Sequence, residues 1–133
     1  MTDIVYREGF DERAFLALAQ LVWPRDYQDE AARAALACTI NIGAWDGESL
    51  VGSVRILTDG YFFATIPEIL VAPAYQRRGI GAELMLRAIE RAPRNKVAFG
   101  AQPQSVEFFT RIGCQQTLTG FVATAALRRR RGP

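Results

Sequence analysis

Apolar positions in the first part of the chain predict a short strand followed by two helices. Residues Ile4–Glu8 alternate weakly between apolar and polar side chains, as in a strand. Asp11 is suited to cap a helix, and apolar residues then recur every three to four positions until Pro24 ends the pattern. An alanine-rich stretch, Asp29–Cys38, predicts the second helix because alanine is the strongest helix former.

From Ile40 onward the pattern changes to that of an antiparallel sheet. Three apolar runs, Ile40–Trp45, Leu50–Leu57 and Tyr61–Val71, are separated by two Asp-Gly pairs. Asp-Gly between apolar runs is a strong hairpin signal, so three consecutive antiparallel strands are predicted. Pro67 lies inside the third run and lacks the amide hydrogen that a central strand donates. We therefore expect a bulge or a splay of the strands there.

The second half of the chain alternates between helix and strand patterns. A third helix is predicted over Gly79–Ala92, and a short buried strand over Val97–Ala101. A fourth helix is predicted over Ser105–Ile112, closed by Gly113, and a final β segment over Gln116–Leu127. The sequence contains no internal repeat and no linker, so we expect one domain.

Composition excludes several kinds of active site. The chain has 133 residues, of which 50% are hydrophobic, and it contains no histidine. The absence of histidine excludes Ser-His-Asp hydrolysis, Cys-His proteolysis and HExxH zinc chemistry. The two cysteines, Cys38 and Cys114, are too few for a zinc site and lack CxxC spacing, so we expect packed thiols and no metal.

Targeting signals and charge give further expectations. The N-terminus has no apolar leader and no stretch is long enough to cross a bilayer, which predicts a cytoplasmic protein without membrane contact. Residues 1–60 carry a net charge of −5 and residues 61–133 carry +7. Four of the later bases form the run Arg128–Arg131. We expect residues 128–133 to be a disordered basic tail rather than a nucleic-acid-binding segment, because no aromatic residues are interleaved with the arginines.

The segment from Gln76 to Ala82 carries the clearest chemical signal. It lies between a predicted strand and a predicted helix, and its two glycines allow backbone amides to turn inward as an anion-binding nest. Arg77 and Arg78 add positive charge at the same place. The segment lacks the GxxxxGK[ST] of a P-loop and the third glycine of a dinucleotide fingerprint. A phosphate site and a helix cap that binds nothing are the two interpretations.

The wider context of this loop resembles a known family. Residues 68–85, which include Val71-Ala72-Pro73-Ala74-Tyr75 and Gln76-Arg77-Arg78-Gly79-Ile80-Gly81, are similar to the acetyl-CoA-binding segment of the GNAT (Gcn5-related) N-acetyltransferase superfamily. The order of predicted elements agrees over nearly the whole chain. The resemblance implies a GNAT-like α/β (α+β) single domain over residues 1–127. Its mixed, mostly antiparallel sheet would have about six to seven strands splayed near Pro67, flanked by about four helices.

The resemblance also implies a binding site for acetyl-CoA, with no metal. The backbone of Ile69–Val71 would pair with the pantetheine arm, and the amides of Arg77–Ala82 would hold the pyrophosphate. The implied cofactor-binding residues are Ile69, Leu70, Val71, Gln76, Arg77, Arg78, Gly79, Ile80, Gly81, Ala82, Gln102, Phe108 and Phe109.

Two positions depart from the family pattern. Phe109 stands where many members carry a tyrosine that protonates the departing thiolate, and a phenyl ring cannot donate a proton. Cys114 stands where an aromatic residue usually follows the glycine; without a neighbouring base, it is expected to be a packed thiol. Water, Tyr61 or Tyr75 would then have to protonate the thiolate, or the thiolate would be protonated only after release.

Three further residues are candidates for catalysis or acceptor binding. Glu68 is the candidate general base, which would take a proton from an ammonium nucleophile directly or through water. The alternative is a structural carboxylate bound to strand amides at the bulge. Trp23 and Tyr27, around Pro24, are candidates for binding the acceptor, and core packing is their alternative.

The resemblance implies an N-acetyltransferase that passes an acetyl group from acetyl-CoA to a primary amine by direct attack in a ternary complex. The acceptor is expected to be a small molecule, and a homodimer is compatible with the family. The basic second half would suit the CoA phosphates and the acidic first half a cationic amine. Phe109 favours one alternative, a non-catalytic acyl-CoA-binding regulatory protein. Another is an acetyltransferase acting on a protein or an aminoacyl-tRNA, with Arg128–Arg131 as its electrostatic contact.

Overall fold

The structure of the protein, a computed structural model, describes residues 3–125. Its chain forms two compact units, one up to Phe99 and one from Gly100 onward, and each is described by itself. The first unit contains β1 (Val5–Glu8), α1 (Glu12–Val22), α2 (Asp29–Ala37), β2 (Ile40–Asp46), β3 (Ser49–Thr58), β4 (Ala64–Thr65), β5 (Ile69–Val71) and α3 (Ile80–Arg91), with 3₁₀ turns at Pro73–Tyr75 and Pro93–Asn95. The second unit contains a 3₁₀ turn at Pro103–Ser105 and α4 (Val106–Arg111).

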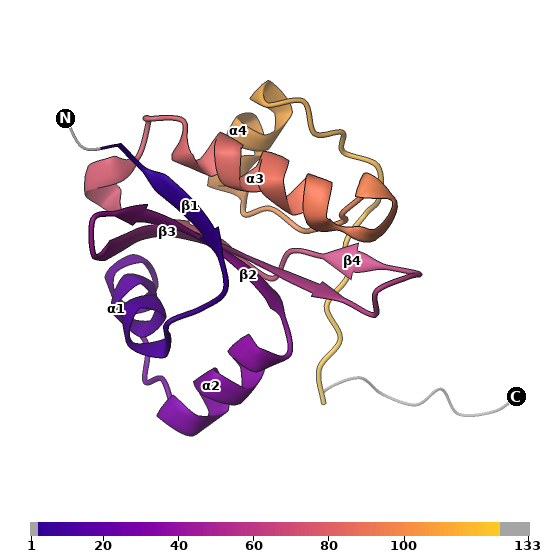
Figure 1. The fold of residues 1–133 in the computed structure, drawn as a ribbon. Helices are drawn as coiled ribbons and strands as arrows, with labels where there is room; N and C mark the ends of the chain where they lie inside the picture. The colour runs from indigo at the N-terminus through magenta and orange to yellow at the C-terminus, as the bar shows by residue number, and fades with distance from the viewer. Residues whose placement is uncertain (1–2, 126–133) are drawn as a thin grey trace, which may run out of the picture. The chain divides into compact units, whose positions relative to one another are not determined.

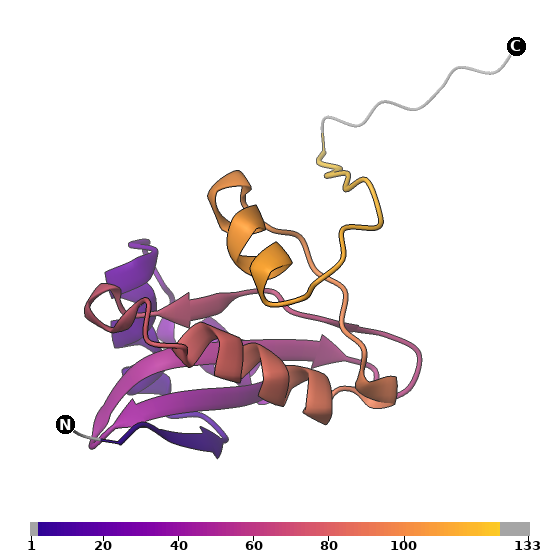
Figure 2. The ribbon, with the colours of Figure 1, turned by 90° about the horizontal axis from the view of Figure 1, so that it is seen from above.

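The sheet of the first unit is antiparallel and has five strands in the order β1-β2-β3-β4, with β5 also paired to β3. Helices α1 and α2 lie on one face and α3 on the other (Figure 1). The view from above in Figure 2 shows α3 lying along the sheet. This arrangement confirms the α+β class, the flanking helices and the antiparallel strands predicted from the Asp-Gly pairs.

The sheet has fewer strands than the six to seven that the sequence predicted. Of the expected strand Val97–Ala101, only Ala98 pairs, in a parallel bridge with Thr65. The expected β segment after Gln116 forms no strand up to Ala125, and its last two residues lie outside the described residues. An apolar pattern indicates only that a segment favours the extended conformation. A strand forms only where a neighbouring backbone pairs with that segment, and the pattern does not supply this neighbour.

The second Asp-Gly pair begins a loop that is longer than the sequence predicted. Tyr61, Phe62 and Phe63 were expected in a strand, but their backbone amides donate to Oδ1 of Asp59 at 2.9, 2.7 and 3.2 Å. A side-chain oxygen that accepts these amides competes with the strand ladder, so the strand starts only at Ala64.

Pro67 interrupts the sheet as predicted. Leu57 pairs with Thr65, whereas the amide of Arg55 donates to the carbonyl of Glu68 at 3.3 Å. Ile66 and Pro67 therefore stand opposite Ile56 alone, which is a β-bulge of one extra residue. The bulge separates β4 from β5 along the same neighbour, β3.

Close packing holds α3 against the sheet. Leu84, Met85 and Ala88 of α3 are fully buried. A Cβ built at Gly52 on β3 would lie 3.0 Å from Ile80 and 3.1 Å from Leu84, so glycine is needed there for the helix to approach. This packing fixes where α3 begins, and with it the position of the loop between β5 and α3.

Candidate functional site

The first feature of the site is an open edge on β5. The Arg55 amide donates to Glu68, and the Ala72 amide donates to Val51 at 2.8 Å. In an antiparallel ladder, alternate residues direct their backbone groups to the same neighbour. Ile69 and Val71 therefore direct theirs away from β3, toward an edge that no other strand of residues 3–125 pairs with. Leu70 instead faces Ser53, so only Ile69 and Val71 present edge groups.

The second feature is the loop that joins β5 to α3. Arg77 has a φ of 65° and Gly79 has a φ of 82°, so two left-handed residues bend the backbone before the helix. A Cβ on Gly79 would meet nothing within 4 Å, which means that its φ rather than the space requires glycine. No side chain caps α3, and the first amides of a helix have no acceptor within it. The turn at Arg77–Gly79 and the uncapped first amides of α3, together called the cradle below, have the geometry expected of an anion-binding site.

The loop and the edge are joined by a side chain. Nε2 of Gln76 donates to the carbonyl of Val71 at 3.2 Å. This carbonyl belongs to the open edge, so Gln76 already donates a hydrogen bond to one of the backbone groups that a bound peptide-like arm would use. Edge and cradle lie within a dozen residues of one another along the chain, from Ile69 to Gly79.

Tyr75 contacts two residues, one before the loop in the sequence and one within it. Its hydroxyl donates to the carboxylate of Asp46, and the guanidinium carbon of Arg78 lies 4.9 Å from the centre of its ring. The hydrogen bond to Asp46 is the main cause that raises the pKa of Tyr75 above its ordinary value. A tyrosine that is already donating to a carboxylate is a poor proton donor for a thiolate, which weakens that interpretation of Tyr75.

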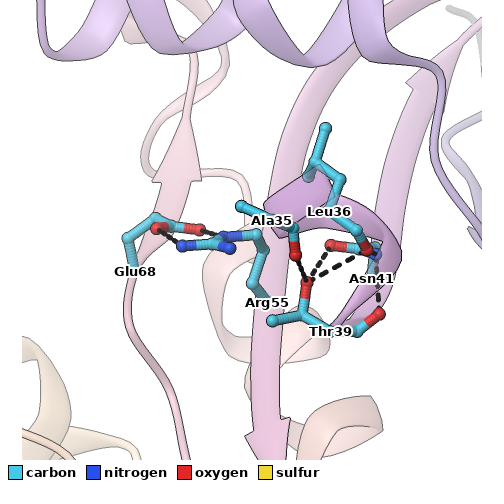
Figure 3. Close-up of polar contacts among 6 residues, drawn as sticks. All are labelled: Ala35, Leu36, Thr39, Asn41, Arg55 and Glu68. Carbon is cyan, nitrogen blue, oxygen red and sulfur yellow. Dashed lines mark hydrogen bonds and ion pairs between the residues drawn. The ribbon is translucent and has the colours of Figure 1, made fainter. Parts of the chain in front are cut away.

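Glu68 lies beside the bulge in an ion pair with Arg55 (Figure 3). Nη2 of Arg55 donates to Oε1 at 2.7 Å, and its Nε donates to Oε2. The two side chains are 17% and 11% exposed, so the pair is mostly shielded from water. The expected structural alternative placed strand amides around Glu68, whereas the structure places a guanidinium there. The sequence analysis did not identify Arg55. The signal that could have found it is the strand register, because a residue of opposite charge directly across from Glu68 is its expected partner.

The candidate acceptor residues lie between α1 and α2. The Tyr27 hydroxyl donates to the carbonyl of Trp23 at 2.7 Å, and Trp23 is 45% exposed. An open hollow of about 420 Å³ is lined by Tyr27, Gln28, Asp29 and Glu30. Trp23 is thus not a core residue. Tyr27 packs against the buried cluster that contains Leu18 and also lines this hollow, which includes two carboxylates.

The remaining predicted residues belong to the second unit. Gln102 precedes the turn at Pro103, and Phe108 and Phe109 lie in α4 with their rings edge to face, 5.0 Å apart. Phe109 is buried, at 8% exposed.

Cys114 is partly buried, and this burial raises the pKa of its thiol, which makes it a weaker nucleophile. The expectation of a packed thiol is wrong for Cys38, which is exposed at the C-cap of α2 because that helix buries only Leu36.

Among residues 3–125, no three His, Cys, Asp or Glu side chains gather as a metal site would require. Within the same range, no helix is both long enough and apolar enough to cross a membrane.

Comparison with other proteins gives concordant results. The model of the "Acetyltransferase (GNAT) family" matches residues 7–114. "GCN5-related N-acetyltransferase 2, chloroplastic" of Arabidopsis thaliana is 34% identical over 76 residues, which are 51% of this chain and 30% of that protein. "Histone acetyltransferase TAP1" of Glycine max is 34% identical over 67 residues, covering 48% of this chain and 29% of that protein. The chain thus spans about a third of the length of these curated relatives.

Solved structures share the fold over nearly the whole chain. The GNAT family protein SP0256 of Streptococcus pneumoniae superposes with a TM-score of 0.76 at 26% identity, covering 96% of this chain and 100% of that one. The aminoglycoside acetyltransferase AAC(6')-Iy, in complex with the bisubstrate analogue CoA-S-monomethyl-acetylneamine, has a TM-score of 0.76 at 15% identity, covering 95% and 100%. The second likeness is one of fold alone.

Proposed function

Because the chain belongs to the acetyltransferase (GNAT) family, we propose that it transfers an acetyl group from acetyl-CoA to a primary amine by direct attack in a ternary complex. The observation that carries the proposal is the combination of the open edge at Ile69 and Val71 with the anion cradle at Gly79. An acyl-CoA has an amide-containing arm that can pair with a strand edge and phosphates that can bind helix amides. The two halves of the site match the two halves of this cosubstrate.

Positioning supplies most of the catalysis that this site offers. The edge would hold the pantetheine arm in an extended conformation, and the cradle would fix its phosphate end. A thioester held at both ends loses little further freedom when the amine attacks, which is the main advantage of a ternary complex. Backbone amides near the carbonyl of the thioester would polarise it.

Glu68 is the proposed general base, because an attacking amine must be neutral. Arg55 engages both carboxylate oxygens of Glu68, yet each oxygen retains a second lone pair that can accept a proton from the amine or from a water. In the competing proposal, the ion pair between Arg55 and Glu68 only stabilises the attachment of the bulge to β3. Variants of both residues separate the two roles.

The proposed acceptor is a small cationic amine. Tyr27, Asp29 and Glu30 line one hollow, so an ammonium group would meet an aromatic ring and two carboxylates there. The basic run Arg128–Arg131, on which a macromolecular acceptor would depend, lies outside the described residues. The soybean relative is named as a histone acetyltransferase, so a protein acceptor belongs in the same assay.

A second candidate function is binding without catalysis. Phe109 is a buried phenyl ring, and the Tyr75 hydroxyl is committed to Asp46. Neither side chain offers a proton to a departing thiolate. A protein that binds acyl-CoA and regulates another process would have no need of such a donor.

Calorimetric titration with acetyl-CoA and with CoA, followed by an assay of thiol release against a panel of amines and a basic peptide, tests both candidates. Binding with thiol release for one class of acceptor supports the transferase and identifies its substrate class. Binding without release favours the regulatory protein. The absence of binding would contradict both.

A further inference from the structure

Three side chains from separate segments form a chain of contacts that ends at the anion cradle. Asp46 is the last residue of β2, Tyr75 is the last of the 3₁₀ turn, and Arg78 directly precedes Gly79. The Tyr75 hydroxyl donates to the Asp46 carboxylate across 29 residues of sequence. The Arg78 guanidinium lies over the face of the Tyr75 ring at 4.9 Å.

These contacts restrict a side chain that would otherwise be mobile. A hydrogen bond to a charged acceptor is among the stronger ones, so Asp46 fixes the direction of the Tyr75 ring. The ring face attracts the guanidinium of Arg78 through its quadrupole. Arg77, the preceding residue, has no corresponding ring or ion-pair contact within residues 3–125. Only one of the two adjacent arginines is therefore held in place.

The held guanidinium keeps its hydrogen-bonding capacity. Within the described part of the chain, Arg78 donates no hydrogen bond to a carboxylate or carbonyl. An exposed arginine loses considerable conformational entropy when it grips a ligand, and a ring that holds it beforehand reduces that loss. Its planar group of N–H donors matches the oxygens of a phosphate.

We propose that Asp46 and Tyr75 are positioning residues that hold the Arg78 guanidinium beside the loop as a ligand for a phosphate of CoA. The inference rests on the proposed function, since it assumes that CoA occupies the cradle. It adds to that function a contribution from the β2–β3 hairpin, which lies outside the glycine-containing loop. Because Asp46 and Tyr75 act through Arg78, their effect must disappear when Arg78 is absent.

A double-mutant cycle measured by calorimetric titration with CoA tests this dependence. Arg78→Met is expected to raise the Kd about tenfold, since it removes a charge-assisted hydrogen bond. Tyr75→Leu is expected to raise the Kd about threefold by releasing the guanidinium. The double variant should bind no more weakly than Arg78→Met alone, because the two residues form one unit.

A matched control separates this effect from the loss of one positive charge. Arg94 makes the same kind of contact, with its guanidinium carbon 5.3 Å from the ring centre of Tyr61, and has no part in the cradle. Arg94→Met should change the Kd by less than about twofold. Tyr75→Phe, which keeps the ring and loses the hydroxyl, and Asp46→Asn should each raise the Kd by less than about threefold, and neither should raise it further when combined with Arg78→Met. These two variants also test the inference if Tyr75→Leu fails to fold.

The outcomes distinguish this inference from the proposed function. Losses that add fully in the double variant would overturn it, because Tyr75 would then act independently of Arg78. An unchanged Kd for Arg78→Met, with normal binding by the unmodified protein, would overturn it as well. Failure of the unmodified protein to bind CoA would instead contradict the proposed function. Dephospho-CoA assigns the contact: an equal loss with this ligand supports a role at the pyrophosphate, and a loss with CoA alone supports one at the 3′-phosphate.

Discussion

At the scale of single residues, the chemistry of the site depends on which partner each charged group meets. Glu68 is a candidate base from the sequence alone, but its partner Arg55 is 13 residues away and could be found only from the register. Similarly, the sequence makes Tyr75 a candidate proton donor, but its hydroxyl already donates to Asp46. A residue type predicts a capacity for chemistry, and the neighbours decide how much of it is used.

Replacement of Glu68 by glutamine should lower kcat about tenfold or more at saturating acetyl-CoA, because the variant lacks a general base. The measurement is steady-state thiol release with an accepted amine. Arg55→Met provides the control, since it breaks the same ion pair and keeps the carboxylate. Both variants should lose about 2 kcal/mol in the free energy of unfolding in urea.

If Glu68 only fastens the sheet, the two variants should lose similar stability and both keep kcat. If it is the base, only Glu68→Gln should lose kcat by an order of magnitude. An unchanged kcat in Glu68→Gln would remove this residue from the mechanism.

At the scale of elements, local chemistry set the boundaries that were predicted well. Asp11 caps α1 by accepting from the amide of Ala14 at 3.0 Å, as expected from its position. Pro24 and Gly113 similarly lie just beyond the ends of α1 and α4. The expected strands at Val97–Ala101 and after Gln116 failed, because their partners are set by distant parts of the chain.

Gly79→Ala should weaken CoA binding while costing about 1 kcal/mol of stability, since alanine is strained at a φ of 82°. Gly60 is the matched control: its φ is 86° and a Cβ there also meets nothing within 4 Å. Gly60→Ala should lose similar stability and keep its CoA affinity. Calorimetry and urea unfolding measure the two effects. Equal affinities in both variants would contradict the assignment of the cradle to Gly79.

The loop after β3 should respond to pH through Asp59. Its three backbone hydrogen bonds, with the one from Tyr61 contributing most, lower the pKa of Asp59 below its ordinary value. A pKa lower in the folded state means that the carboxylate stabilises the loop above its unfolded pKa of about 4. This contribution is lost as the pH falls through the folded pKa.

Hydrogen exchange at the amides of Tyr61, Phe62 and Phe63 measures this dependence. Protection should fall at acid pH in the unmodified protein. Asp59→Asn keeps an oxygen acceptor without a charge, so its protection should be nearly independent of pH in this range. A pKa of Asp59 in the ordinary range by NMR titration would contradict the prediction.

At the scale of the whole molecule, the family and the fold agree. The family model covers residues 7–114, and a solved family member with a TM-score of 0.76 covers nearly the whole chain. The cytoplasmic location, the homodimer and the roles of Gln102, Phe108 and Phe109 stay predictions. Residues 128–133, expected to form a basic tail, lie outside the described residues.

CoA should raise the melting temperature if the whole site binds as proposed. At a concentration 100 times the Kd, a ligand of the folded state adds about 2.7 kcal/mol of stability. For a domain of this size, that corresponds to a rise of about 10 °C. At the same concentration, pantetheine, which lacks the phosphates, should raise the melting temperature much less. Equal shifts with both ligands would show that the cradle does not contribute.

The sequence by itself determined the features that depend on near neighbours. The hairpin turn at Asp46-Gly47, the cap at Asp11, the interruption at Pro67 and the glycine loop before α3 each arise from a few consecutive residues. Turn chemistry and helical periodicity act over about four positions, so they can be read along the chain.

Only the tertiary structure decided which distant groups meet. The bulge shifts the register of β5 on β3, and this shift places Glu68 opposite Arg55 and directs the backbone of Ile69 and Val71 to the open edge. The meeting of Asp46 with Tyr75 likewise depends on how the β2–β3 hairpin lies against the loop. Such contacts follow from the packing of separate elements, because an offset of a single residue redirects every side chain and backbone group of a strand.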